Sequence, residues 1–129
     1  MNKIFSLVAV AVLAALYGCV SPRTSGVVVE KGRIVFEDPA FAANIEVLQD
    51  VRERTQEGFL HAQVALKNTN RTDYECQYRF EWRGANGMMQ KHAPTPWRPI
   101  LMHGREPVEL DAVSPLQGTD DFRLIIRRR

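Results

Sequence analysis

Tyr74–Arg83 reads Tyr-Glu-Cys-Gln-Tyr-Arg-Phe-Glu-Trp-Arg, and this stretch decides the fold. Aromatic or apolar residues occupy every second position from Tyr74 to Trp82, and Glu, Gln and Arg occupy the positions between them. Successive side chains of a β-strand point to opposite faces, so the alternation predicts a strand with one buried face and one solvated face. Each buried aromatic side chain removes about 150–250 Å² from water, which is enough to organise the core of a small domain.

Further strand-like segments lie on both sides of this strand. They cover Val27–Phe36, Ile45–Arg54, Phe59–Lys67, Met88–His92, Ile100–Met102, Val108–Val113 and Asp121–Arg127. Turn-forming residues separate them and no long helical period occurs, which is typical of a β-sandwich. We therefore predict an all-β, immunoglobulin-like antiparallel sandwich of about seven strands. Because neighbours in sequence usually pair, residues 59–67, 74–83 and 88–92 are expected to form a meander.

Two local patterns refine this prediction. In the segment that begins at Ile45, the expected inward residues are Ile45, Val47 and Val51, and Leu48 interrupts the alternation, which indicates a bulge. Asp38 precedes Pro39, a pair that suits the N-cap and first position of a single helical turn.

The first 18 residues have the pattern of a lipoprotein signal peptide. A short positive start, Met1-Asn2-Lys3, precedes the apolar run Ile4–Leu16, which is shorter than the roughly 20 residues of a membrane-spanning helix. The run ends in Leu16-Tyr17-Gly18-Cys19, which resembles a bacterial lipobox. We expect cleavage before Cys19 and lipidation of Cys19. The alternative is an ordinary signal peptide followed by an unrelated cysteine.

This interpretation divides the chain into a signal peptide (1–18), a lipidated tether (19–26) and a β-sandwich domain (27–129). Several acyl chains on Cys19 would anchor the domain stably. By resemblance to enteric lipoproteins, Val20 after the lipidated cysteine favours the periplasmic face of the outer membrane. Cys76 then has no partner in the chain, and its place on the apolar face of its strand predicts a buried, unreactive thiol.

Charge excludes one class of partner. The formal net charge is +2 and both signs are interspersed, whereas a nucleic-acid-binding protein usually carries a concentrated basic face. The one basic run, Arg127-Arg128-Arg129, is expected to be a solvated tail, with attraction to anionic lipid as the alternative.

From Phe59 onward the sequence resembles the YcfL-like family of bacterial periplasmic lipoproteins. The matching features, in order, are Val64 and Leu66 before Asn68, Gln77 to Trp82, Gly87, Pro96-Trp97, His103 to Glu106, Val108 to Pro115, and Asp121 to Leu124. The resemblance implies an immunoglobulin-like sandwich without an established activity. In some bacteria such proteins are encoded beside a lipoprotein activator of peptidoglycan synthases, which links the family to envelope work by association.

Motifs for chemistry are missing from the sequence. His61, His92 and His103 lie on three different segments without the spacing of metal ligands, and no nucleophile elbow or phosphate-binding loop occurs. We therefore expect no catalytic residue, no bound metal and no cofactor.

The segment from Trp97 to Glu106 is the candidate for partner binding. Trp97, Arg98 and Arg105 are its strongest candidates, because Trp and Arg are enriched at interface hot spots. The alternative is architectural: Trp97 would cap an open end of the sandwich, Gly104 would permit the turn, and Arg105 would pair with a carboxylate.

The resulting hypothesis is a lipid-anchored, non-enzymatic lipoprotein whose partners are the membrane, through its lipid, and an envelope protein or peptidoglycan. Two alternatives stay open. One is a cell-wall-modifying enzyme with an unrecognised site, which would need a deep pocket with two carboxylates or a histidine. The other is a carrier of a small hydrophobic ligand, which would need a cavity between the sheets.

Overall fold

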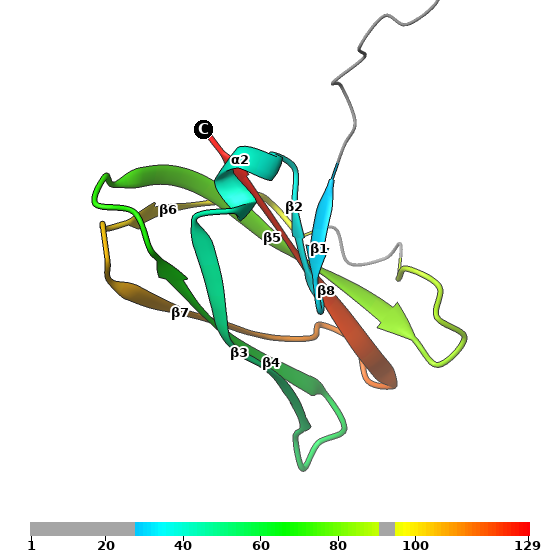
Figure 1. Cartoon of the computed structure of the whole chain (residues 1–129). Helices are drawn as coiled ribbons and strands as arrows, with labels where there is room; N and C mark the ends of the chain where they lie inside the picture. The colour runs from blue at the N-terminus through cyan, green and yellow to red at the C-terminus, as the bar shows by residue number, and fades with distance from the viewer. Residues whose placement is uncertain (1–27, 91–94) are drawn as a thin grey trace, which may run out of the picture.

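The computed structural model describes residues 28–90 and 95–129, and these form two packed β-sheets (Figure 1). The elements are β1 (Val29–Lys31), β2 (Ile34–Phe36), α2 (Pro39–Ala42), β3 (Ile45–Arg54), β4 (Leu60–Asn68), β5 (Tyr74–Gly84), β6 (Arg98–Met102), β7 (Pro107–Val113) and β8 (Thr119–Arg128). The predicted sandwich is therefore confirmed, with eight strands. The expected signal peptide (1–18) and tether (19–26) lie outside the described residues.

The strands divide unequally between the sheets. The five-stranded sheet has the order β1-β2-β8-β5-β6, and the three-stranded sheet has the order β3-β4-β7. All pairs are antiparallel except β2 with β8, which run parallel. An alternating pattern shows which face of a strand is buried and says nothing of its direction, so this parallel pair was not predicted.

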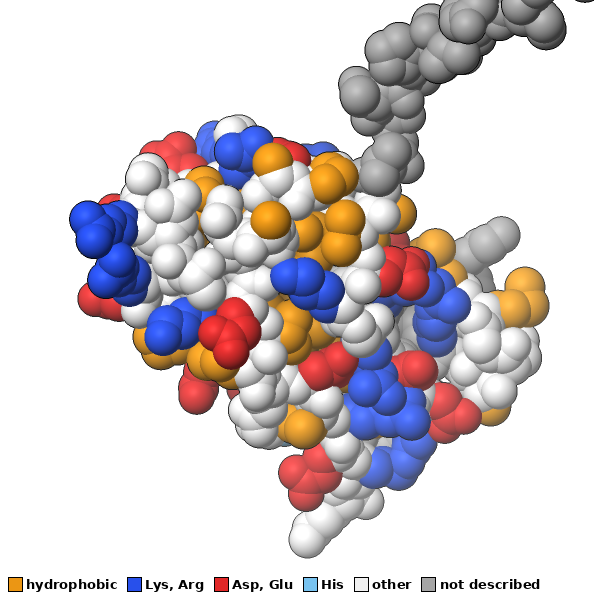
Figure 2. All heavy atoms as spheres, viewed as in Figure 1, with side chains coloured by type: hydrophobic (Ala, Val, Ile, Leu, Met, Phe, Trp, Pro, Cys, Tyr) orange, Lys and Arg blue, Asp and Glu red, His pale blue; other side chains and the backbone are white. Residues whose placement is uncertain are grey.

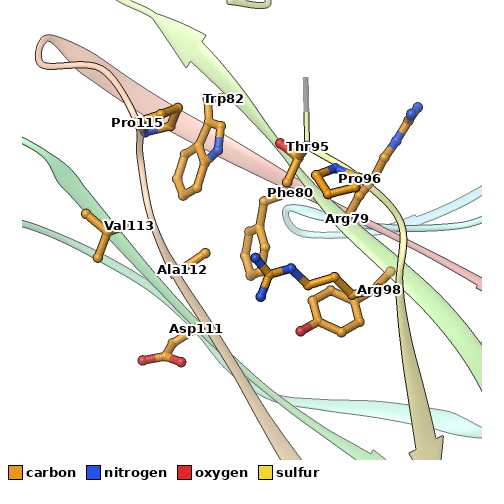
Figure 3. A pocket seen from close by; sticks show the side chains of 11 residues that line it. Arg79, Phe80, Trp82, Thr95, Pro96, Arg98, Asp111, Ala112, Val113 and Pro115 are labelled. Carbon is orange, nitrogen blue, oxygen red and sulfur yellow. The ribbon is translucent and has the colours of Figure 1, made fainter. Parts of the chain in front are cut away.

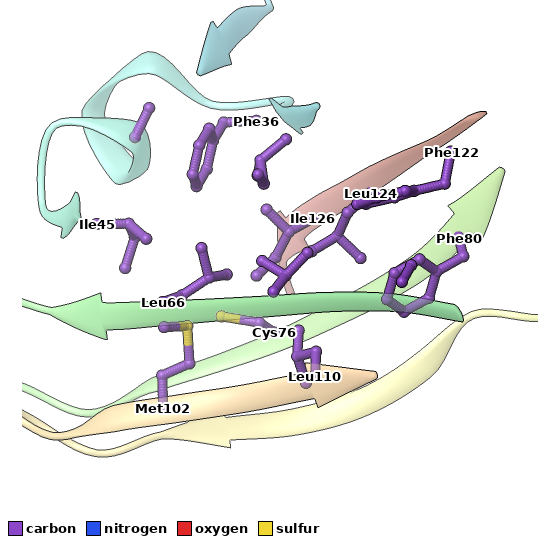
Figure 4. Close-up of a cluster of buried hydrophobic side chains, with 14 of the residues drawn as sticks. Phe36, Ile45, Leu66, Cys76, Phe80, Met102, Leu110, Phe122, Leu124 and Ile126 are labelled. Atoms are coloured by element: carbon purple, nitrogen blue, oxygen red, sulfur yellow. The ribbon is translucent and has the colours of Figure 1, made fainter. Parts of the chain in front are cut away.

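The deciding strand behaves as its pattern predicts. β5 lies between β8 and β6 in the five-stranded sheet. Its inward face carries Cys76, Phe80 and Trp82, which are all buried, while Glu75 on the other face is exposed. β8 supplies the adjoining part of the core through Phe122, Leu124 and Ile126 (Figure 4). These side chains meet those of β4 from the opposite sheet, which gives one continuous apolar core.

The predicted meander is wrong. β4 pairs with β3 and β7, and β5 belongs to the other sheet. The connection between β4 and β5 crosses from one layer to the other, so the two strands are neighbours in sequence only. The expected return strand is reduced to an isolated bridge between Arg83 and Met89, and its last residues, 91–92, are not described.

A bulge at Leu48 divides β3 into an apolar half and a charged half. The register with β4 shifts between Val47 and Gln49, as the interrupted alternation predicted. Ile45 and Val47 contribute to the core, but Val51 is 40% exposed, so its predicted inward position is wrong. The extra residue shifts the alternation by one position. Asp50 and Arg52 consequently stand opposite the inward residues of β4.

Ion pairs neutralise the charged half of β3. Arg33 reaches Asp50 at 3.3 Å and Asp121 at 2.7 Å, and Arg52 also reaches Asp121 at 2.7 Å. Burial raises the pKa of Asp121, but the hydrogen bonds from Arg33 and the N–H of Phe122, together with the charges of Arg33 and Arg52, hold that pKa below its ordinary value. Figure 2 shows the interleaved basic and acidic side chains on this part of the surface.

The predicted helical turn joins the two sheets. Asp38 caps α2 by accepting hydrogen bonds from the backbone N–H groups of Ala40 and Phe41, and Phe41 is fully buried. α2 has four residues, and nowhere in residues 28–90 and 95–129 is a helix long and apolar enough to span a membrane.

Candidate functional site

A pocket of about 350 Å³ opens between β5 and β7 at one edge of the sandwich (Figure 3). We call it the β5–β7 pocket. Its described lining consists of Tyr78, Arg79, Phe80, Trp82, Thr95, Pro96, Arg98, Asp111, Ala112, Val113 and Pro115. The volume lies at the lower end of the range of about 300–1,000 Å³ that is usual for ligand sites.

Unequal strand lengths explain why the pocket forms here. β6 pairs only with Tyr74–Tyr78 of β5, so Phe80 and Trp82 lie beyond the end of their neighbouring strand. On the opposite layer, β7 is the outermost strand of the three-stranded sheet. The small side chain of Ala112 faces the large rings of β5 across the gap, which leaves space between the layers.

Aromatic rings form the inner wall of the β5–β7 pocket. The rings of Phe80 and Trp82 are stacked, with centroids 5.7 Å apart and an interplanar angle of 14°. Tyr78 meets Phe80 edge-on, at 6.1 Å and 88°. Both Phe80 and Trp82 are almost fully buried, so the wall is firmly packed before any ligand arrives. Because little ring surface is exposed, an apolar group that enters the pocket gains affinity mainly through its own surface that leaves water.

Three charged residues border the pocket, and one of them, Arg79, already has a counter-ion. Arg79 pairs with Glu81 at 3.3 Å, and Figure 3 shows its side chain directed away from the pocket. Oδ2 of Asp111 lies within hydrogen-bond distance of Nε2 of His61, at 3.2 Å, and this contact is an ion pair only when the imidazole is protonated. Arg98 forms no ion pair with any described residue, and its guanidinium group reaches in front of Phe80 (Figure 3). Among the described residues, the mouth of the pocket therefore presents Arg98 without an ion-pair partner, together with the exposed carboxylate of Asp111.

The structure separates the three residues predicted for partner binding. Arg98 lines the β5–β7 pocket. Trp97 stacks instead between two guanidinium groups on the outer face of the five-stranded sheet, 3.8 Å from Arg127 and 4.7 Å from Arg79, measured from each guanidinium carbon to the ring centroid. Trp97 therefore caps neither open end of the sandwich, contrary to the architectural alternative.

Arg105 lies in the turn between β6 and β7, away from the pocket. It has a positive φ of 63°, and its backbone N–H donates to the carbonyl of Asn70. Within the described part of the chain its side chain pairs with no carboxylate, so the expected ion pair is wrong. Gly104 is required by close packing and not by a positive φ, because a Cβ there would lie 2.1 Å from the carbonyl oxygen of Arg71.

The C-terminal arginines are not a free tail. Arg127 and Arg128 belong to β8, so the prediction of a tail is wrong for both, although Arg128 is exposed as predicted. Arg127 donates two hydrogen bonds to Oε1 of Gln77, at 3.1 and 3.0 Å. Arg128 pairs with Asp38, and this hydrogen bond is the main reason why the pKa of Asp38 lies below its ordinary value.

Sequence reasoning missed the β7 side of the pocket, formed by Asp111, Ala112 and Val113. The available signal was the small Ala112 in an otherwise bulky strand, but its significance depends on which strand lies opposite. Among the described residues, no three His, Cys, Asp or Glu side chains are grouped as a metal site would require.

Cys76 is buried, as its position on the strand predicted. Burial raises the pKa of its thiol to about 11, against a small opposing effect of Arg128. The raised pKa keeps the thiol protonated at pH 8, and only the thiolate is a good nucleophile.

We expect iodoacetamide to alkylate Cys76 at pH 8 at least about 100-fold more slowly in the folded chain than in urea. The measurement uses the Cys19→Ala variant, so that Cys76 is the one thiol present. Equal rates in the folded and unfolded chain would show that Cys76 is accessible and reactive.

Comparison with solved structures supports the fold. The structure of cj0090 from Campylobacter jejuni matches with a TM-score of 0.66 and 17% identity, over 77% of this chain and 100% of that chain. A DUF1425 family member from Shewanella sp. pv-4 matches with a TM-score of 0.59 and 22% identity, over 87% of this chain and 97% of that chain. At these identities the likeness shows a shared fold alone.

Comparison of the sequence identifies a family. None of the curated proteins matches the sequence. The model of the family described as "Protein of unknown function (DUF1425)" matches residues 32–128, which includes all the strands from β2 to β8. The chain therefore belongs to the DUF1425 family of proteins of unknown function.

Proposed function

We propose that this protein is a lipid-anchored module of the bacterial periplasm that binds an envelope protein in the β5–β7 pocket and catalyses no reaction. The observation that carries the proposal is the pocket itself: an aromatic wall behind a mouth that presents an unpaired cation. Partners bind such surfaces through an apolar anchor and a few placed polar contacts.

The proposed anchor rests on the sequence at the N-terminus. Leu16, Gly18 and Cys19 match a lipobox, Cys19 is the lipidated residue, and Val20 favours the outer membrane. The resemblance of residues 59 onward to the YcfL-like lipoproteins agrees with this assignment. An anchored domain has a high effective concentration near partners on the same membrane, so a small pocket of modest affinity is sufficient.

A photo-crosslinking residue at Val113 tests the binding site in intact cells. Val113 lines the pocket and is 53% exposed, and Leu48, which is 49% exposed on β3 away from the pocket, provides the matched control. We expect a discrete crosslinked species from position 113 that position 48 does not give. Ala112→Phe, which fills the pocket, should reduce this crosslink at least about ten-fold, because the apolar anchor loses its place.

The outcome that would contradict the proposal is the same crosslinked species from both positions, or a crosslink from position 113 that survives Ala112→Phe. Thermal melting of the Ala112→Phe variant verifies that it is folded, so that a lost crosslink reports on the pocket.

A carrier of a small hydrophobic ligand is the second candidate. Such a carrier needs a cavity between the sheets, and the β5–β7 pocket lies at their edge. Extraction of the purified protein with organic solvent, followed by mass spectrometry, would reveal a stoichiometric ligand. The enzyme alternative is not favoured by this pocket, because its described lining contains one carboxylate, Asp111, and no histidine.

A further inference from the structure

We infer that the β5–β7 pocket takes the C-terminal residue of its partner protein: the last side chain, an apolar one, enters the pocket, and the free carboxylate binds Arg98. This inference rests on the proposed function, because it names the part of the partner that is bound. Three features of the pocket support it, namely its unpaired charge, its size and its position beside a strand edge.

The charge specifies an anion. Of the charged residues that border the pocket, Arg79 is paired with Glu81, and the exposed carboxylate of Asp111 is in hydrogen-bond contact with His61. Arg98 has no counter-ion among the described residues, and its guanidinium group lies in front of the aromatic wall. A guanidinium group binds a carboxylate through two parallel hydrogen bonds, which makes it selective for this group.

The size specifies a single apolar side chain. The pocket measures about 350 Å³, at the small end of ligand sites. The stacked pair of Phe80 and Trp82 offers a flat apolar wall, and Ala112 leaves room opposite it. A single large side chain fits these dimensions better than a long acyl chain does.

The neighbouring strand provides a place for the partner's backbone. β7 is the outermost strand of its sheet, and within the described residues it pairs with β4 alone. Asp111, Ala112 and Val113 belong both to this strand and to the pocket lining. An extended peptide can add to such an edge through its main chain while its last side chain enters an adjacent pocket.

The test compares two forms of one peptide, acetyl-Gly-Thr-Val-Phe with a free C-terminal carboxylate and the same peptide as a C-terminal amide. Both are titrated by calorimetry into the full chain purified from membranes. We expect the free acid to bind at least about ten-fold more tightly, since a hydrogen bond to a charged group typically has an effect of this size.

Three variants make the result specific. In Arg98→Gln the dissociation constants of the acid and the amide should become about equal. In Arg105→Gln, which changes a distant arginine that forms no ion pair with any described residue, the acid should still bind more tightly. Ala112→Phe should weaken both peptides. Equal binding of acid and amide by the unchanged protein, or a preference that survives in Arg98→Gln, would overturn the inference.

The proposed function is judged separately. If neither peptide binds, the C-terminal inference is wrong. The crosslink from position 113 in intact cells still decides whether the pocket binds an envelope protein.

Discussion

Replacing Gly104 with alanine should destabilise the folded domain by about 3 kcal/mol, because the added methyl group overlaps main-chain atoms that cannot move away. A Cβ at this position would lie 2.1 Å from the carbonyl oxygen and 2.5 Å from the carbonyl carbon of Arg71. The two turns involved are held together on both sides of the overlap. The N–H of Gly104 donates to Asp73 at 2.8 Å, and the N–H of Arg105 donates to the carbonyl of Asn70 at 2.9 Å.

A buried asparagine makes relaxation of these turns more costly. Asn68 is 0% exposed and donates to the carbonyls of Thr72 and Met102, which connects the turn after β4 to the end of β6. Separating the turns to accommodate a methyl group would leave these buried polar groups without partners.

Gly84→Ala is the matched control for this substitution. A Cβ at Gly84 would lie 3.4 Å from a side-chain oxygen of Asn86, and no backbone atom is among its nearest neighbours. We expect its free energy of unfolding to change by less than about 1 kcal/mol. Urea unfolding followed by tryptophan fluorescence measures both variants. A Gly104→Ala variant as stable as Gly84→Ala would mean that the two turns do not approach as closely as described.

The strands could be predicted because their patterns are long and regular. Tyr74–Trp82 on β5 alternates without interruption and buries Cys76, Phe80 and Trp82, and the segments Leu60–Leu66 on β4 and Phe122–Ile126 on β8 bury every second residue. Alternation fixes the buried face of a strand but not the identity or direction of its neighbour. This is why the meander was wrong and the parallel pairing of β2 with β8 was missed.

The wrong prediction for Val51 follows from the bulge at Leu48, which changes which residues of β3 face the core. The bulge at Leu48 was predicted, but Val51 was still assigned to the inward face by counting every second residue from Ile45 and Val47, as if the strand had no bulge. One inserted residue exchanges the two faces of the strand. The charged residues Asp50 and Arg52 then face inward, where Arg33 and Asp121 neutralise them.

The candidate site could be predicted only in part. Arg98 was selected because of its residue type, and it does line the β5–β7 pocket. The aromatic wall was visible in the sequence but was assigned wholly to the core. Its partial opening depends on where β6 ends and which strand lies opposite, and neither can be read from the pattern of β5. Arg105 was selected for the same reason, but it does not line the pocket.

Replacing Cys19 with alanine should abolish stable membrane attachment of the mature protein. Signal peptidase II requires the lipidated cysteine of the lipobox, so the variant should accumulate uncleaved or be released. The residues that the structure describes begin at Val28, and the exchange at position 19 lies outside them. Fractionation of cells with immunoblotting, and with Cys76→Ala as the control for loss of a thiol, should show the control cleaved and in the membrane fraction, and Cys19→Ala either uncleaved or cleaved and soluble. A Cys19→Ala protein that is cleaved and membrane-bound as before would contradict the proposed anchor.

The intact mass of the mature protein tests the central claim most directly. We propose a β-sandwich held at a membrane by acyl chains on Cys19, and this requires a chain that begins at Cys19 with a thioether-linked lipid and an acylated amine. The predicted mass is therefore that of residues 19–129 plus these groups. A mature chain that begins elsewhere, or one with an unmodified Cys19, would contradict the account.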